Sequence, residues 1–381
     1  MAKHIVVVGA GAVGACTAYF LAQKATPGLS VTVVEKTKVA CAASGKAGGF
    51  LARDWCDGSA IGPIARKSFA LHAELADKLD GKSKYGYRPV DTYSVFVQTG
   101  KKAGQRKPAA VESSTIEWVD NENIKAIQQL GTTSDTAQVH PGQFTNTVLG
   151  AAEDTGIVRV QCGTGVSGLL YSEEDGHTVV GVELENGDTI QADAVIVCMG
   201  PWSGQLELKG SSHRVNALPI EGSRAHSIVC RPKLTVPAQA LFTEIIEGRR
   251  SYSPEVYPRP DGTVYMCGAT DDEPLPSSAD QVKIDQEAID QLKALKDVVS
   301  PQLEGEITAE QACYLPISRD GTPLIGMHPK YKQLYVATGH SCWGILNSPA
   351  TGLMMAELVL NGEVYSIDER AVRSVDPRNR C

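Results

Sequence analysis

The segment that most constrains the fold is residues 5–14, Ile-Val-Val-Val-Gly-Ala-Gly-Ala-Val-Gly. Its four consecutive apolar residues are typical of a parallel strand buried on both faces. In the turn that follows, Gly9 permits a tight backbone, Gly11 lets a phosphate approach the main chain, and Gly14 lets a helix pack closely. Because the free N–H groups at a helix start bind anions, the segment predicts a strand, turn and helix that hold a pyrophosphate.

A second apolar run, Val31–Val34, ends on Glu35, twenty-one residues after Gly14. A carboxylate at the tip of the second strand can accept the two hydroxyls of an adenosine ribose. An acidic residue there also disfavours a 2′-phosphate, so NADP is not expected. The combined pattern predicts an NAD or FAD site. The alternative is an ordinary glycine-rich turn between a strand and a helix.

Length and charge narrow the class of protein. A chain of 381 residues is longer than one hydrophobic core normally serves, so two structural units are expected. The formal net charge of −8 argues against nucleic acid or an anionic membrane as partner. No apolar run approaches the ~20 residues that span a bilayer, and a first strand near Ile5 leaves no room for a signal peptide, so a cytoplasmic location is expected.

The cysteines predict free thiols. There are ten of them, without regular spacing and without a CxxC pair. This usage fits reduced thiols better than disulfides or zinc ligands, so no metal site is expected.

The remaining pattern predicts two interleaved domains. Apolar runs such as 195–199 belong to a parallel sheet, whereas 84–136 and 214–317 carry the alternation of antiparallel strands. We therefore expect a nucleotide-binding domain from residues 1–83, 137–213 and 318–381, and a substrate domain from the other two stretches. The polar residues 99–108 are expected to form an exposed hairpin loop. A ligand pocket should lie between the domains.

Near the C-terminal end, Leu334–Thr338 is expected to be a strand and 339–347 a loop. Ser348 and Pro349 would then begin a helix, with serine as N-cap and proline at the first helical position.

Several motifs in this order resemble the FAD-dependent oxidoreductases of the D-amino-acid oxidase type, which include glycine oxidase, sarcosine oxidase and D-amino-acid dehydrogenase. The motifs are Gly9–Gly14 with Glu35, Ala43–Gly49, Val166, Met199–Ser203, Pro258–Gly262 with Gly268–Thr270, Asp320–Gly326 and Gly339–Gly352. The resemblance covers nearly the whole chain. It implies an α/β fold, in which a doubly wound, Rossmann-type FAD-binding domain accompanies a mostly antiparallel α+β substrate domain whose sheet covers the flavin.

The resemblance also implies FAD as the cofactor. The sequence agrees independently, because a single glycine fingerprint leaves no second site for a nicotinamide donor. The residues implied to bind FAD are Gly9, Gly11, Ala12, Val13, Gly14, Glu35, Lys36, Ala43, Ser44, Lys46, Ala47, Gly48, Gly49, Val166, Gly200, Trp202, Gly339, His340, Trp343, Gly344, Ile345 and Leu346. For Lys46 the alternative is a solvated loop lysine, and Trp202 and Trp343 more often pack than act.

Members of this family transfer a hydride from a carbon bearing an amine to flavin N5, and an arginine binds the substrate carboxylate. Where glycine-oxidase-like members carry that arginine, this chain has Leu315. Sarcosine-oxidase-like members use an arginine and a lysine at positions that correspond here to Arg53 and Leu346. Arg53 is therefore the predicted carboxylate anchor. Its alternative role is an ordinary arginine paired with Asp54.

Three further residues are candidates for catalysis: Glu255 and Tyr257, on the strand expected over the flavin, and His340 in the flavin loop. Glu255 could bind a cationic amine or polarise a water, or it could form a salt bridge at the strand edge. His340 could tune the flavin, or it could hold the loop in place.

Cys313 matches the position of the cysteine that carries flavin covalently in sarcosine-oxidase-like members. The alternative is a buried, inert thiol, and we favour non-covalent FAD.

The leading hypothesis is oxidation of the C–N bond of a small amine or amino acid, with hydrolysis of the resulting imine and transfer of electrons to oxygen or another acceptor. The missing carboxylate arginine supports a different class of protein, a flavin-binding assembly or trafficking factor without turnover. A dehydrogenase that uses an acceptor other than oxygen is the third hypothesis. Substrate, acceptor and oligomeric state lie beyond the sequence.

Overall fold

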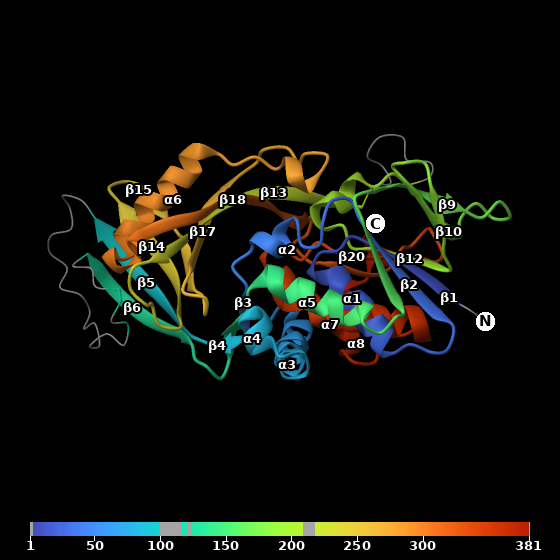
Figure 1. The fold of residues 1–381 in the computed structure, drawn as a ribbon, viewed down its shortest axis with the longest axis horizontal. Coiled ribbons are helices and arrows are strands. Elements are labelled where there is room, and N and C mark those ends of the chain that lie inside the picture. Colours follow the sequence, from blue (N-terminus) through green and yellow to red (C-terminus); the bar gives the residue numbers. More distant parts are fainter. Residues whose placement is uncertain (1–2, 100–115, 117, 120–122, 209–217, 381) are drawn as a thin grey trace.

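The structure is a computed structural model that describes residues 3–99, 116, 118–119, 123–208 and 218–380. Two large sheets lie toward opposite ends of its long axis (Figure 1). One is mostly parallel and carries the glycine turn, and the other is mostly antiparallel. The α/β fold class predicted from sequence is confirmed. The domain boundaries themselves stay a prediction.

The first sheet is built around the two apolar runs of the N-terminal segment. In spatial order its strands are β19 (Leu324–Met327), β20 (Leu334–Thr338), β12 (Ala194–Val197), β1 (Lys3–Val8), β2 (Leu29–Glu35) and β8 (Val158–Cys162), and all neighbours are parallel except β19 and β20. In β1, Ile5 and Val7 belong to the core shared with the helices, whereas Val6 and Val8 belong to the core on the other face. The continuous apolar run is thus explained by burial on both faces.

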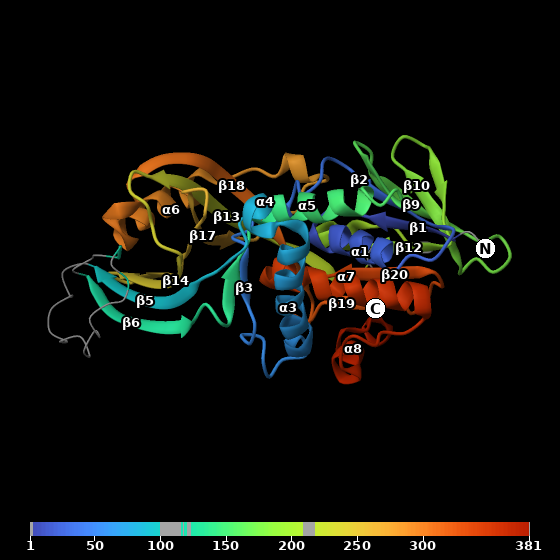
Figure 2. The same cartoon turned by 60° about the horizontal axis from the view of Figure 1, so that its bottom comes forward.

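Helices cover the first face of this sheet. They are α1 (Ala12–Gln23), α5 (Pro141–Glu153) and α7 (Gly344–Asn361), with α3 (Gly62–Leu79), α4 (Gly81–Tyr85) and α8 (Glu369–Val375) outside them. Figure 2 shows α3 beside α7, with α8 near its end. The second face carries a small antiparallel sheet of β9 (Val166–Tyr171), β10 (Val179–Leu184) and β11 (Thr189–Gln191).

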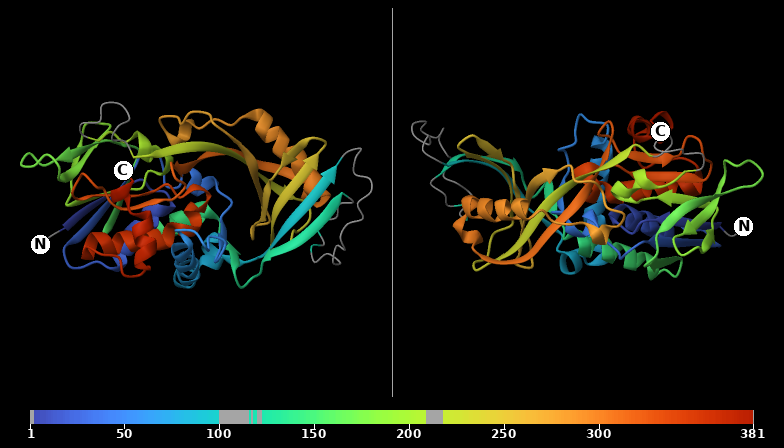
Figure 3. Two further views of the ribbon diagram at one scale, coloured as in Figure 1. Left: turned by 180° about the vertical axis from the view of Figure 1, so that it is seen from behind. Right: turned by 90° about the horizontal axis from the view of Figure 1, so that it is seen from above.

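The second large sheet has eight strands and one packed helix. The strands are β5 (Asp91–Thr99), β6 (Ile124–Gly131), β13 (Ile220–Pro232), β14 (Gln239–Glu247), β15 (Arg250–Tyr252), β16 (Glu255–Pro258), β17 (Val264–Asp271) and β18 (Gly305–Ser318), and the helix is α6 (Gln286–Val299). Figure 3 shows the long β13 and β18 running side by side from this sheet toward the parallel one. The ends of these two strands at Ile220 and Ser318 therefore lie near the parallel sheet that carries the glycine turn.

Short elements complete the chain. They are α2 (Ala43–Lys46), the sheet of β3 (Phe50–Ala52), β7 (Thr136–Gln138) and β4 (Arg88–Pro89), and the short 3-10 helices η1 (Gly200–Gln205), η2 (Ala279–Gln281), η3 (Pro301–Leu303), η4 (Ser341–Trp343) and η5 (Pro377–Asn379). Within the described part of the chain, no helix is long and apolar enough to cross a membrane.

The predicted start of the last helix is wrong. Helix α7 begins at Gly344, four residues before Ser348, and Pro349 lies inside it. Proline donates no hydrogen bond to the carbonyl of Ile345. That carbonyl instead contacts Ser348 Oγ at 2.9 Å and His72 Nε2 at 3.0 Å. The helix can therefore run through the proline without leaving the Ile345 carbonyl unpaired.

Two more sequence expectations differ from the structure. The strand expected to carry Glu255 and Tyr257 is only the four-residue β16, because the chain breaks between β15 and β16 at Ser253 and Pro254. Strand β18 was missed altogether, although it pairs with β13 from Gly305 to Ser318. Residues 100–108 of the predicted hairpin loop lie outside the described residues.

Candidate functional site

The glycine turn between β1 and α1 has no room for side chains. Gly9 has φ of 105°, and a Cβ there would lie 2.5 Å from the carbonyl oxygen of Cys198. A Cβ on Gly14 would lie 2.0 Å from the carbonyl oxygen of Gly9. The turn and the first helical residues are therefore pressed together, as a pyrophosphate cradle requires.

Glu35 is held next to this cradle by three donors. Its Oε2 accepts from the backbone N–H of Ala10 at 3.0 Å, and its Oε1 accepts from the N–H and the hydroxyl of Thr37, both at 3.0 Å. A carboxylate has about four acceptor positions, so acceptor capacity remains for a ribose hydroxyl. The contacts fix the direction in which that capacity points.

A cavity of about 390 Å³ runs along the turn and under the roof formed by β18. It brings together these predicted cofactor residues: Gly9, Gly11, Ala12, Val13, Glu35, Lys36, Ala43, Ser44, Ala47, Val166, Gly200, Trp202, His340, Gly344 and Ile345. They come from segments more than 300 residues apart in sequence, which the parallel sheet places at one edge.

The other predicted cofactor residues do not line this cavity: Gly14, Lys46, Gly48, Gly49, Gly339, Trp343 and Leu346. Lys46 Nζ donates to the carbonyl of Ala312 at 3.0 Å, and Leu346 is buried in the core. A Cβ on Gly48 would lie 2.3 Å from the ring of Tyr257. The absence of a side chain at Gly48 therefore lets Tyr257 on β16 lie against the segment 43–49.

The sequence reasoning missed one wall of the cavity. Ser277, Ser278 and Ala279 line it from the loop after β17. The indole N–H of Trp202 holds this loop by donating to the carbonyl of Pro276 at 2.7 Å. No local motif marks the loop, because its position follows from the long β13 and β18.

The start of α7 is the second helix end at the cavity. Gly344 and Ile345, its first residues, line the cavity. A helix start carries partial positive charge from its unpaired N–H groups. The earlier start of α7 thus brings that charge to the cavity, where a helix beginning at Ser348 would leave it farther along the chain.

His340 lines the cavity from the turn before α7. It is buried, its Nε2 lies 3.0 Å from Thr351 Oγ1, and burial lowers its pKa to about 4. The imidazole is therefore neutral at pH 7. Its contact with α7 fits the expectation of a loop-holding histidine, and its place in the cavity also leaves it near the ligand.

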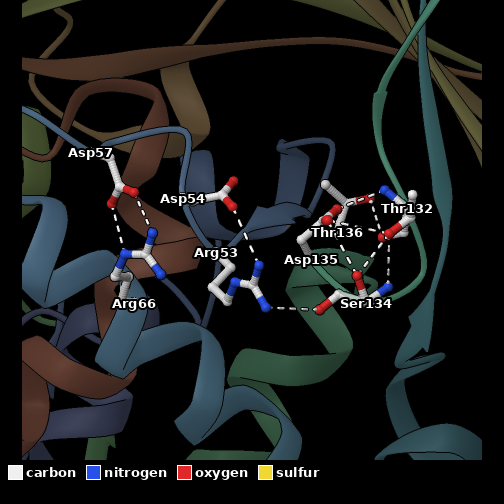
Figure 4. Close-up of polar contacts among 8 residues, drawn as sticks. All are labelled: Arg53, Asp54, Asp57, Arg66, Thr132, Ser134, Asp135 and Thr136. Atoms are coloured by element: carbon white, nitrogen blue, oxygen red, sulfur yellow. Dashed lines mark hydrogen bonds and ion pairs between the residues drawn. The ribbon is translucent and has the colours of Figure 1, made fainter.

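Arg53, the predicted carboxylate anchor, does not line this cavity. Its side chain is 41% exposed and pairs with Asp54 at 3.4 Å, and it also donates to the Ser134 carbonyl at 3.4 Å. Figure 4 shows this pairing beside the separate Asp57 and Arg66 pair. The geometry favours the alternative role of Arg53, and the anchor assignment stays a prediction.

Glu255 and Tyr257 lie next to one another on β16. The Tyr257 hydroxyl donates to Glu255 Oε2 at 2.5 Å, and the Cys267 thiol donates to the same oxygen at 3.6 Å. Burial raises the pKa of Glu255, and these two hydrogen bonds only partly oppose it. Among the described residues Glu255 makes no ion pair, so the predicted salt bridge at the strand edge is wrong.

Leu315 and Leu346, which stand where relatives have an arginine and a lysine, differ in their surroundings. Leu315 lines the cavity, whereas Leu346 points into the core. Cys313, two residues before Leu315, is buried and does not line the cavity, and burial raises its pKa to about 11. Its thiol is protonated at pH 7 and is therefore a poor nucleophile.

The residues fit a flavin dinucleotide. The cradle at Gly9, the ordered acid at Glu35 and a second helix start at Gly344 line one continuous cavity. A shorter nucleotide would leave one of the two helix starts unused.

Comparisons with known proteins agree with this fit. A family profile described as FAD dependent oxidoreductase matches residues 4–358. The chain is 33% identical over 382 residues to a putative oxidoreductase of Schizosaccharomyces pombe, with 96% of each chain covered. It is 28% identical over 376 residues to a glycine oxidase of Pseudomonas aeruginosa, with 95% of this chain and 96% of that protein covered.

The fold is also shared with solved structures. The crystal structure of glycine oxidase from Geobacillus kaustophilus matches with a TM-score of 0.78 at 20% identity, covering 98% of each chain. The sequence match over most of the chain and a cavity lined by the glycine turn, Glu35 and the start of α7 lead to the same conclusion. The chain belongs to the FAD-dependent oxidoreductases of the D-amino-acid oxidase type, and its cofactor is FAD.

Proposed function

We propose that this protein oxidises the C–N bond of a small amine or amino acid. The observation that supports the proposal most directly is the position of Glu255 near Cys342, an exposed residue that lines the cofactor cavity. The charge of Glu255 contributes to the raised pKa of the Cys342 thiol, second only to burial. Glu255 does not itself line the cavity, but it lies behind Cys342, close to the helix start that we assign to the flavin.

Bound FAD supplies the acceptor for a hydride from the carbon that bears the amine, with oxygen or another acceptor taking the electrons afterwards. The residues of the chain stabilise charge and exclude water around the reacting groups. Gly344, at the start of α7, lies where its N–H group favours negative charge. The apolar Leu315 and Pro316 in the cavity wall exclude water from the reacting carbon.

The test is anaerobic reduction of the flavin in the purified holoprotein. D-amino acids, glycine, sarcosine and simple primary and secondary amines are each added, and absorbance near the flavin maximum is followed. We expect at least one compound to bleach the flavin. Full retention of the oxidised spectrum across the panel would contradict the proposal and favour a flavin-binding factor without turnover of small amines.

A further inference from the structure

One wall of the cofactor cavity comes from outside the parallel sheet. Ser277, Ser278 and Ala279 line the cavity, and they belong to the loop that joins β17 to α6, residues 272–285. This loop has no strand and only the short η2, yet it extends from the antiparallel sheet to the cavity that we assign to FAD. A segment of the second sheet is therefore in a position to contact the cofactor.

Both ends of this loop are fixed by one arginine. The guanidinium of Arg224 on β13 donates to the Asp271 carboxylate at 2.9 Å and to the carbonyl of Lys283 at 3.0 Å. The N–H of Asp285 also donates to His226 Nε2 at 2.9 Å. Ends that lie close together are typical of compact surface loops of about 6–16 residues, which often have functional roles. A movement of the loop would therefore involve the residues beyond this base.

A stiff arm leads from the base toward the cavity. Residues 274–276 are Pro-Leu-Pro, and proline has a fixed φ and donates no hydrogen bond. The arm is held through its carbonyls instead. The Tyr314 hydroxyl donates to the carbonyl of Pro274 at 2.9 Å, and the indole N–H of Trp202 donates to that of Pro276 at 2.7 Å. Because the two donors lie on β18 and on η1, which follows β12, the arm is anchored to both parts of the fold.

The tip of the loop, residues 277–281, makes no hydrogen bond to the rest of the described chain. Ser277 Oγ donates to Gln281 Oε1 at 2.9 Å. Ser278 Oγ donates to Asp280 Oδ1, so both contacts stay within the tip. Segments with few outside contacts open most easily. The position of the tip against the cavity therefore depends on the two anchors of the arm.

The tip also approaches the segment after β2. The hydrogen bond from Ser278 does most to lower the pKa of Asp280, and the charge of Lys36 lowers it further. Lys36 lines the cavity directly after β2, so the tip extends toward the end of the cavity that this strand forms. Asp280 is exposed, and solvent screens its attraction to Lys36. The attraction favours a closed tip without locking it.

From these contacts we infer that the arm and the tip, residues 274–281, form a cofactor strap that closes over bound FAD and whose opening sets the rate at which FAD leaves. Tyr314 and Trp202 are its positioning residues, because they act through the arm. A hydroxyl both donates and accepts, so Ser277 and Ser278 can exchange a contact within the tip for one with the cofactor. The strap concerns the cofactor and not the substrate, so it is independent of the proposed function.

The first test removes one anchor without changing the cavity wall. Tyr314→Phe deletes the hydroxyl that binds Pro274, and Tyr314 itself is buried and does not line the cavity. Release of FAD from the holoprotein after dilution is followed by flavin fluorescence. We expect release to become about 3–10-fold faster, as the loss of one hydrogen bond predicts. The control is Tyr93→Phe, at a buried tyrosine on β5 of the same sheet, which should leave the release rate unchanged.

A second variant tests the stiffness of the arm. Pro276→Gly keeps the carbonyl that accepts from Trp202 but frees the φ angle, so the open strap gains conformational freedom. Release of FAD should become about 2–5-fold faster. Pro237→Gly, at an exposed position between β13 and β14, is the control. A release rate that is unchanged in either strap variant, with or without a lower thermal midpoint, would overturn the strap, since its anchors would then support only the fold.

Hydrogen exchange tests the unmodified protein. Amide exchange is measured in the full-length chain before and after removal of FAD. We expect bound FAD to slow exchange at residues 277–281 by more than at residues 172–178, which connect β9 to β10 and do not line the cavity. An equal change in the two segments would mean that FAD does not hold the tip closed, and the inference would fail.

Discussion

The two ends of the cavity are built in different ways. At the pyrophosphate end, residues 9–14 supply the cradle in one uninterrupted turn, and backbone atoms make the close contacts. At the end where we propose that the substrate binds, Leu315 on β18 and Cys342 in η4 line the cavity, so side chains from separate elements supply its surface. The first end is therefore constrained by steric exclusion and tolerates little change. At the second end the properties of individual side chains matter, and these can be replaced without changing the backbone of the fold.

The largest effect is expected from Gly14→Ala. The new methyl would sit 2.0 Å from the Gly9 carbonyl oxygen, in backbone that cannot move without opening the turn. We expect a loss of about 3 kcal/mol or more in stability and loss of most of the bound FAD. Flavin absorbance per protein and the thermal midpoint measure both.

Gly150→Ala is the matched control, since Gly150 lies inside α5 and its Cβ would meet nothing within 4 Å. This change should stabilise the protein by about 0.5–1 kcal/mol, because alanine favours the helix more than glycine does. Similar flavin content in both variants would show that the turn is looser than its geometry indicates.

A smaller effect is expected from acid, and it should begin at the flavin end. Burial lowers the pKa of His72 and of His340 to about 4, and both contact α7, His72 at the Ile345 carbonyl and His340 at the Thr351 hydroxyl. The unfolded chain therefore binds more protons than the folded one between about pH 6.5 and 4. The stability from keeping these residues neutral is fully present above pH 6.5 and is lost as the pH falls toward 4.

His340→Gln keeps a polar group near Thr351 and removes one titration. We expect the drop in unfolding free energy between pH 7 and pH 4 to shrink by on the order of 3 kcal/mol. Urea midpoints at pH 7, 5.5 and 4 measure it. His177→Gln, at an exposed position, should leave the slope as it is. Equal slopes for the two variants would place the acid sensitivity elsewhere.

The same difference between the two ends explains how much could be predicted from the sequence. The glycine turn, Glu35 and β20 depend on local features, and the structure has them where the sequence indicated. The start of helix α7 does not follow from local features. Ser348 and Pro349 are a local signal for a helix start, but His72 on α3 supplies a partner for the Ile345 carbonyl, to which Pro349 cannot donate. A contact from a distant helix overrides the local signal and is not visible in the sequence around it.

The substrate end was predicted in part and for similar reasons. Glu255 was identified as a candidate, but in place of the salt bridge given as its alternative role it accepts hydrogen bonds from Tyr257 and from Cys267 on the neighbouring strand. The aromatic cluster of Phe50, Trp55 and Phe242 was not anticipated, since these rings become neighbours only when the segment around β3 meets β14. Resemblance located the missing arginine at Leu315, whereas only the tertiary structure shows what surrounds that position.

The smallest effect is expected at the adenosine end, where Lys36 and Glu185 form an ion pair of 2.6 Å beside the cavity. Their side chains are 38% and 41% exposed, so solvent screens the attraction. Lys36→Ala should change stability by less than about 0.5 kcal/mol and weaken FAD binding by no more than about 3-fold. Flavin fluorescence titrations of Lys36→Ala, Glu185→Ala and the double variant, at low and high salt, measure the coupling. A loss of 10-fold or more that persists in high salt would mean that Lys36 contacts the cofactor directly. This end of the cavity would then depend on a side chain as well as on the backbone of residues 9–14, and the contrast with the substrate end would narrow.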